Sequence, residues 1–203
     1  MNIILFDGPE RDDLLPLTFT RPVADLRCGI LTLREKWEKR SGLTTTTLTE
    51  EYLSTKWPTV EEDDNIIVNG ALCATDELYD AVANLAAGQV LRSKESEEIL
   101  AVRANIEDLE SGAIDDMESV TFAGEYVHIR YPWDLFRNNG PELERDFIVL
   151  TDGRSSAPIS SSNTVMGDRI FLEEGATVEA SILNSTTGPI YLGKDATIME
   201  GCI

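Results

Sequence analysis

The stretch IFLEEGATVEASIL (Ile170–Leu183) repeats every six residues, and IYLGKDATIMEGCI (Ile190–Ile203) repeats in the same way. A six-residue period is typical of a parallel β-helix, in which each hexapeptide forms one short side of a triangular coil. The segment NSTTGP (Asn184–Pro189) shifts the phase by two residues. We therefore expect a left-handed parallel β-helix in which one small and one branched apolar residue of each hexapeptide face inward. The residues predicted to face inward are Ile170, Ala176, Ile182, Ile190, Ala196 and Cys202, and Leu172 and Val178 repeat at the same period.

An antiparallel hairpin with alternating apolar residues is the alternative interpretation of the same stretch. A β-helix buries its core by stacking coils, and an uncovered end exposes apolar side chains and strand edges. The repeat continues up to Ile203. We therefore expect the chain to be part of a longer protein, truncated in its coil, and to associate with itself as a homo-oligomer.

The composition limits the classes of function. The chain has 203 residues, of which 42% are hydrophobic and 27% charged, with a net charge of −20. This charge argues against binding to nucleic acid or to an anionic membrane, although a local basic cluster can still bind a small anion. Cys28, Cys73 and Cys202 form neither a disulfide framework nor a metal motif. With no signal peptide in the first residues, we expect a cytoplasmic protein.

Strands and helices alternate over the first part of the chain, which predicts an α/β domain. The expected elements are a strand at 2–6, a helix at 30–40, strands at 43–48 and 65–69, and a helix at 76–87. The segments QVLRS and EILAVR are expected to pair, and a helix that starts at Pro132 is expected to break at Asn139-Gly140. A Ser-rich segment (Asp152–Asn163) follows, so we predict two domains, 1–150 and 160–203.

The loop after the first strand is the best candidate for anion recognition. It carries Arg11, Arg21 and Arg27, and ligands of α/β sheets bind beyond the carboxyl ends of strands. Guanidinium groups match phosphate oxygens through paired hydrogen bonds. The alternative is that these arginines form ion pairs with neighbouring aspartates. His128 is the only histidine, and we expect it to be structural because no nucleophile or carboxylate motif accompanies it.

The order of several motifs resembles the sugar-phosphate nucleotidyltransferases. The motifs are NIILFDG, Pro16-Leu17-Thr18, Thr20-Arg21-Pro22, the helix entry ILTLREKW, NIIVNGALCATDEL and PWDLFRNN. Together with the hexapeptides, they are similar to a variant group of bifunctional N-acetylglucosamine-1-phosphate uridylyltransferase/glucosamine-1-phosphate acetyltransferases of Bacteroidetes-type bacteria. The fold implied is a Rossmann-like nucleotidyltransferase sheet followed by a β-helix.

The resemblance also implies ligands and roles. The substrates would be a nucleoside triphosphate and a hexosamine 1-phosphate, and the cofactor Mg²⁺, with acetyl-CoA and a trimer only in the intact protein. Asp7 would help to hold the metal, and Arg21 is the candidate catalytic residue. The expected substrate-binding residues are Gly8, Arg11, Arg21, Arg27, Asn69 and Gly70.

The chain departs from the family pattern at three places. The Gly-rich phosphate loop is replaced by Gly8-Pro9-Glu10-Arg11-Asp12-Asp13, and the lysine after it is missing. Ala71 stands where the family has its magnesium aspartate. These departures leave an alternative function open, in which a catalytically degenerate α/β module assembles or regulates a trimeric hexapeptide acyltransferase.

Overall fold

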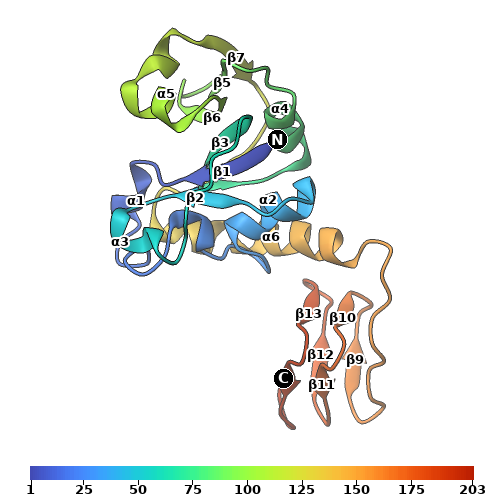
Figure 1. Ribbon diagram of the computed structural model, residues 1–203. Coiled ribbons are helices and arrows are strands. Elements are labelled where there is room, and N and C mark those ends of the chain that lie inside the picture. Colours follow the sequence, from blue (N-terminus) through green and yellow to red (C-terminus); the bar gives the residue numbers. More distant parts are fainter. The chain divides into compact units, whose positions relative to one another are not determined.

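The computed structural model describes residues 1–203, which divide into two compact units, Met1–Asn138 and Asn139–Ile203 (Figure 1). Helix α6 (Pro132–Thr151) contains the dividing point. None of the helices combines the length and the apolar character that crossing a membrane requires.

Unit 1 is built on a six-stranded sheet with the order β2-β1-β3-β6-β5-β7. Its strands are β1 (Asn2–Phe6), β2 (Thr46–Leu48), β3 (Asn65–Asn69), β5 (Gln89–Ser93), β6 (Ile99–Arg103) and β7 (Glu118–Phe122). β1 pairs in parallel with β2 and β3, β5 pairs in parallel with β7, and β6 is antiparallel to both of its neighbours. Five strands therefore run in one direction, and their carboxyl ends meet at one edge of the sheet.

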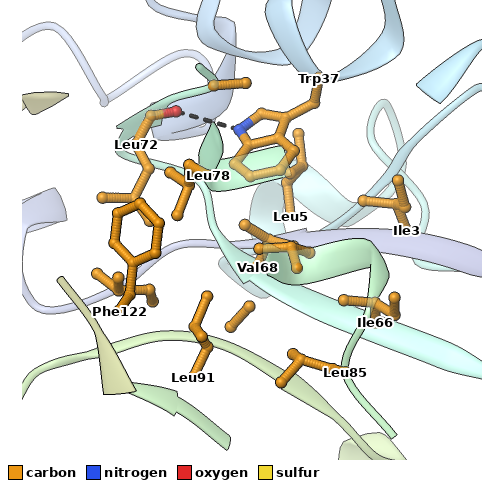
Figure 2. Packing of buried hydrophobic residues seen from close by; sticks show 14 of the residues in the cluster. Ile3, Leu5, Trp37, Ile66, Val68, Leu72, Leu78, Leu85, Leu91 and Phe122 are labelled. Carbon is orange, nitrogen blue, oxygen red and sulfur yellow. Dashed lines mark hydrogen bonds between the residues drawn. The ribbon is translucent and has the colours of Figure 1, made fainter. Parts of the chain in front are cut away.

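Alternation of side chains along the strands gives the sheet two apolar faces. Ile3 and Leu5 of β1 belong to the cluster that α2 (Leu33–Ser41) and α4 (Asp76–Ala83) cover. Figure 2 shows this packing, in which the Trp37 Nε1–H of α2 donates to the Leu72 carbonyl at 3.1 Å. Ile4 lies on the opposite face, where α5 (Ile106–Ser111) and η2 (Ala113–Asp116) contribute apolar side chains. This layering confirms the mixed α/β fold with a mostly parallel sheet.

Helix α2 starts later than the sequence predicts. Thr32 and Glu35 form a capping box at its N-terminus, and Gly42 closes it at a left-handed φ of 69°. The expected start at Ile30 is wrong because residues 27–32 form a tight turn, in which the Cys28 amide donates to the Leu31 carbonyl at 3.2 Å.

A small antiparallel pair and three short helices complete unit 1. β4 (Leu72–Cys73) pairs with β8 (Val127–His128), with Leu72 opposite His128. The short helices are α1 (Glu10–Asp13), η1 (Val23–Asp25) and α3 (Glu51–Ser54). Because β4 follows β3 directly, the β4–β8 pair brings His128 to the carboxyl edge of the sheet.

Helix α6 does not break at Asn139-Gly140, so that prediction is wrong. The helix is continuous over Pro132–Thr151 and includes Pro141. A proline inside a helix removes one hydrogen bond and commonly kinks the helix, but here the helical residues continue on both sides of Pro141. The Asn-Gly pair alone is therefore insufficient to end this helix.

Unit 2 contains six short strands that pair in parallel, each with the strand three places along in the chain. β9 pairs with β12, β10 with β13 and β11 with β14, at sequence offsets such as Thr164 to Ile182 and Ile170 to Ile190. The strands are β9 (Thr164–Met166), β10 (Ile170–Leu172), β11 (Thr177–Val178), β12 (Ile182–Asn184), β13 (Ile190–Leu192) and β14 (Thr197–Ile198). Parallel pairing excludes the antiparallel hairpin.

The expected inward residues of unit 2 are only partly correct. Leu172, Val178, Leu183 and Leu192 form the buried cluster. Of the six residues predicted to face inward, three pack against this cluster: Ile170, Ala176 and Ile190. The other three do not belong to it, and Cys202 is exposed: Ile182, Ala196 and Cys202. Leu183 follows the buried Val178 by five residues instead of six, so the turn that contains Ala180 (φ 47°) is one residue shorter, and Leu183 rather than Ile182 is buried.

Candidate active site at the carboxyl edge of the sheet

The ends of β1 and β3 lie close together at the carboxyl edge. The Gly70 amide donates to the Phe6 carbonyl at 2.8 Å. A Cβ at position 70 would lie 3.0 Å from that carbonyl oxygen and 3.3 Å from the Ala24 Cβ. Asn69 is buried, and its Oδ1 accepts a hydrogen bond from the Ala71 amide. A glycine at position 70 therefore allows the loop after β1 to approach the end of β3.

Asp7 and Arg11 form a buried ion pair just beyond β1. Arg11 Nη1 donates to Asp7 Oδ2 at 2.9 Å, and the two side chains are only 8% and 3% exposed. The second amino group of Arg11 donates to the Thr18 carbonyl and to the Tyr52 hydroxyl. Arg11 therefore ties the loop together, and a phosphate would have to compete with these partners for its donors.

The residues near Asp7 do not suit Mg²⁺. Asp7 Oδ1 accepts from the Val23 amide, and Oδ2 accepts from Arg11 and from the Thr49 hydroxyl. Burial raises the pKa of Asp7 above its ordinary value. It outweighs the hydrogen bonds from Thr49, Val23 and Arg11, which lower the pKa. Ala71 is fully buried in an apolar cluster with neighbours such as Val23. Mg²⁺ requires oxygen ligands in octahedral geometry. This place offers the Asp7 carboxylate, whose oxygens already accept three hydrogen bonds, and the methyl group of Ala71. The residues present therefore do not fit a Mg²⁺ ion.

The other arginines that follow β1, in the loop and in the first turn of α2, divide into two kinds. Arg34 is engaged by Asp25, at 2.6 Å, and by Thr45. Arg27 is exposed and lies 3.7 Å from Glu35. Arg21 is exposed and makes no ion pair or side-chain hydrogen bond. The structure therefore leaves Arg21 and Arg27 accessible, while Arg11 and Arg34 are structural.

A cleft of about 660 Å³ opens at the carboxyl ends of β5 and β7. Its wall is formed by the turn between β5 and β6 and by the connection from β7 to β8. Its charged and polar lining comprises Ser93, Lys94, Glu95, Ser96, Glu125, Tyr126, His128 and Arg130. Hydroxyl, ammonium, imidazole, guanidinium and carboxylate groups therefore face one space, a combination suited to a polar ligand, in which Lys94 and Arg130 are the groups that could contact a phosphate.

Glu98 connects the side chains of the cleft wall. Its Oε1 accepts from the Tyr126 hydroxyl at 2.7 Å and lies 3.1 Å from His128 Nδ1. Its Oε2 accepts from Arg130 Nη2. Burial would raise the pKa of Glu98, but the hydrogen bonds from Tyr126 and His128 and the charge of Arg130 outweigh it and lower the pKa. Glu98 is therefore held as a carboxylate that orders three neighbours.

His128 faces a second carboxylate on its other side. Its Nε2 lies 3.7 Å from Glu10 Oε1, and the side chains are 9% and 6% exposed. Neither of these two atoms has a hydrogen-bond partner. The Glu10 carboxylate folds back over Gly8, where a Cβ would lie 2.7 Å from Glu10 Oε2. Gly8 thus has a role that the phosphate-binding prediction did not include: it leaves room for Glu10.

The sequence suggested the carboxyl edge but not the residues of the cleft. Glu10, Glu98 and His128 are far apart in the chain and meet only because β4 and β8 pair beside the end of β1. The sequence shows no carboxylate motif beside His128, whereas the structure places Glu98 and Glu10 against its ring. The alternation in EYVHIR places Tyr126, His128 and Arg130 on one side of a strand, and this is the signal that could have identified them.

Comparison with known proteins identifies the family of this chain. No curated protein matches the chain. A family model for sugar nucleotidyl transferase matches residues 3–155, which is more than half of the chain and contains the six-stranded sheet except for the first residue of β1. The carboxyl-edge location of the cleft agrees with this match, since α/β sheets bind their ligands there. The chain belongs to the sugar nucleotidyl transferase family.

Proposed function

We propose that unit 1 binds a nucleoside triphosphate and a hexosamine 1-phosphate and joins them into a sugar nucleotide of the UDP-N-acetylglucosamine type. Family membership supports nucleotidyl transfer to a sugar phosphate. The choice of a hexosamine and of uridine rests on the resemblance in motif order. The observation that carries the proposal is the polar cleft at the ends of β5 and β7, because it provides a recess of ligand size at the carboxyl edge.

The chemistry requires positioning and charge compensation. An oxygen of the sugar phosphate forms a bond to the α-phosphorus, and the bond from that phosphorus to the pyrophosphate group breaks. We assign Arg21 and Arg27 to the phosphates of the nucleotide, with Arg21 as the candidate catalytic residue, because their guanidinium groups are accessible. Lys94 and Arg130 line the cleft and would meet the sugar phosphate. Gly8, Asn69 and Gly70 would line the space between the nucleotide-binding arginines and the cleft.

For unit 2, we propose the first coils of a left-handed β-helix. Support comes from three parallel strand pairs at offsets of 18 and 20 residues, each of which equals one passage through three short strands. The shared cluster of Leu172, Val178, Leu183 and Leu192 is what a filled triangular coil requires.

A second candidate function has its own support. The buried Asp7–Arg11 pair and the buried Ala71 close the places where the family resemblance implies phosphate and metal. We therefore keep the alternative in which unit 1 is catalytically silent and assembles or regulates a trimeric acyltransferase that uses acetyl-CoA.

Calorimetric titration separates the two candidates. The whole chain is titrated with UTP, with glucosamine 1-phosphate and with UDP-N-acetylglucosamine. The transferase proposal expects saturable binding of at least one ligand, and pyrophosphate release when UTP and a hexosamine 1-phosphate are supplied together. Absence of binding by all three at millimolar concentration would leave only the assembly role.

A further inference from the structure

A second recess lies at the carboxyl ends of β1 and β2, at the opposite end of the sheet from the cleft. The two strands pair in parallel, and the Asp7 amide donates to the Leu48 carbonyl at 2.9 Å, so the segments that follow them start side by side. Figure 1 shows α1 and α3, which follow these strands, at this end of the sheet. The recess has a volume of about 260 Å³ and is lined by Asp7, Leu48, Thr49, Glu50 and Glu51.

Two exposed aromatic side chains belong to the segments around this recess. Phe19, in the loop after β1, is 58% exposed, and Tyr52 of α3 is 61% exposed. The Tyr52 hydroxyl donates to the Phe19 carbonyl at 3.0 Å and accepts from Arg11 Nη2 at 2.7 Å. Arg11 also contacts two residues that line the recess, Asp7 at 2.9 Å and Glu50 at 3.8 Å. Hydrogen bonds thus fix Tyr52 next to the recess, while its ring and that of Phe19 remain exposed.

These aromatic rings occur together with an accessible cation. Arg21 follows Phe19 by two residues, and its exposed side chain makes no ion pair or side-chain hydrogen bond. Aromatic faces stack on nucleobases, and guanidinium groups bind phosphate oxygens. The carboxylates of Glu50 and Glu51 repel a phosphate, but they accept hydrogen bonds from the N–H groups of a base. The recess therefore suits the base of a nucleotide, and Arg21 suits its phosphates.

We propose that the recess at the ends of β1 and β2 is a nucleobase subsite, in which Phe19 and Tyr52 stack on the base and the lining carboxylates accept its N–H. The inference rests on the proposed function, because it gives a place to the nucleotide that unit 1 would use. β1 and β5 are three strand spacings apart, which corresponds to about 14 Å. The ribose and the phosphates of a nucleotide would bridge this gap between the base and the sugar phosphate in the cleft.

Calorimetric titration with UTP and with inorganic pyrophosphate separates the base from the phosphates. Phe19→Leu removes the ring but keeps the backbone carbonyl to which Tyr52 donates. We expect its affinity for UTP to fall by roughly five- to a hundredfold, the contribution of one stacked base, and its affinity for pyrophosphate to stay unchanged. Phe136→Leu is the matched control, because it makes the same substitution at a side chain of α6 that is 86% exposed.

A second pair of variants tests the other ring. Tyr52→Leu removes the aromatic face and should weaken UTP binding as Phe19→Leu does. Tyr52→Phe loses the hydroxyl but keeps the ring, so it should retain most of the affinity for UTP. An affinity for UTP that is unchanged in Phe19→Leu and Tyr52→Leu would overturn the subsite. Equal losses for UTP and pyrophosphate would overturn it as well, because they would place the effect on the phosphates.

The subsite and the transferase proposal fail in different ways. Titration with UTP alone tests the subsite, whereas pyrophosphate release from UTP and a hexosamine 1-phosphate tests the reaction. If UTP binding depends on Phe19 and Tyr52 but no pyrophosphate is released, the subsite is supported and the transferase proposal fails. If pyrophosphate is released and Phe19→Leu and Tyr52→Leu bind UTP as the parent does, the subsite alone fails. A parent chain that binds no UTP at millimolar concentration would overturn the subsite, whatever the other ligands do.

Discussion

The Arg11 guanidinium lies in the interior of unit 1, where Asp7, Thr18 and Tyr52 accept its hydrogen bonds or pack against it. Arg21 belongs to the same loop but extends into solvent. Two arginines ten residues apart in one loop therefore have opposite roles. Which of them is structural depends on whether a buried carboxylate faces the side chain, and Asp7 faces Arg11.

This difference gives a paired prediction. Arg11→Ala leaves the Asp7 carboxylate buried without its cation, which should lower the free energy of unfolding of unit 1 by about 3–5 kcal/mol. Arg21→Ala removes an exposed side chain that makes no hydrogen bond or ion pair, so the free energy of unfolding should change by less than about 0.5 kcal/mol. Urea unfolding followed by fluorescence measures both. Equal destabilisation by the two substitutions would refute the assignment.

Arg21→Ala carries a second expectation that rests on the proposed function. If Arg21 binds a phosphate group, the affinity for UTP should fall by roughly ten- to a hundredfold, the cost of one charge-assisted hydrogen bond. Because the fold is expected to remain intact, calorimetric titration of this variant reads binding alone. Unchanged affinity would remove Arg21 from the site.

Glu98 gives a prediction about acid stability. Its pKa lies below the ordinary value of 4.5 in the folded protein, since its hydrogen bonds and the charge of Arg130 outweigh burial. A carboxylate with a lowered pKa contributes stability above pH 4.5, and that contribution is lost as the pH falls through the lowered value. The difference in unfolding midpoint between the parent and Glu98→Gln should therefore be present at neutral pH and shrink below pH 4.5. A difference that stays constant into acid would show that charge is not its cause.

At the scale of elements, the turns of unit 2 contact one another, as its paired strands do: the Asp195 amide donates to the Glu174 carbonyl at 3.1 Å. Gly175 has a φ of 77°, and a Cβ there would lie 2.1 Å from Asp195 Oδ1 in the turn between β13 and β14. Asp195 is itself left-handed, with a φ of 57°. The turn between β10 and β11 therefore requires a residue that accepts positive φ and leaves room for a carboxylate.

Gly175→Ala should destabilise unit 2 by about 1–3 kcal/mol, because it combines left-handed strain with displacement of Asp195. Gly193→Ala is the matched control, since nothing lies within 4 Å of its Cβ position and its φ is ordinary. That control should be neutral or slightly stabilising through the unfolded state. Thermal unfolding followed by the Tyr191 environment distinguishes them. Equal midpoints would contradict stacking at this turn.

The elements of unit 1 were predictable where local signals agree with packing. β1, β3 and the β5–β6 pair follow from apolar runs, and Gly112 closes α5 as its sequence indicates. The continuity of α6 was not predictable from its sequence, because Asn139-Gly140 and Pro141 are local signals for the end of a helix. The helix continues through all three residues. In unit 2, the period of six predicted the strands, but the turn that contains Ala180 is one residue shorter than the others, and the buried position moves to Leu183.

The candidate site was less predictable than the fold. The carboxyl edge followed from strand order, and the accessibility of Arg21 agrees with the expected anion loop. The cleft wall did not follow, because Glu10, Glu98 and His128 are brought together by pairing between strands that are distant in sequence. Burial of Arg11 depends on its partner Asp7, which composition alone cannot assign.

At the scale of the whole molecule, charge imbalance is the main electrostatic feature. The chain has 37 acidic and 17 basic residues, so most carboxylates have no cation of their own. Ion pairs such as Arg103–Asp64 and Arg154–Glu173 hold individual elements. The excess acidic residues repel one another, and such self-repulsion destabilises the compact state.

Salt should therefore stabilise this protein. Raising NaCl from about 0.1 M to about 1 M shortens the screening length from about 10 Å to about 3 Å, which weakens repulsion between exposed carboxylates more than it weakens pairs in contact. A gain of about 1 kcal/mol corresponds to an unfolding midpoint higher by about 2–4 °C in a chain of this size. The double variant Glu107→Gln/Glu110→Gln removes two exposed like charges from one face of α5 and should show a smaller rise. Thermal unfolding at the two salt concentrations measures both proteins. A midpoint that falls with salt in the parent would mean that ion pairs outweigh the repulsion, and it would contradict this reading of the −20 charge.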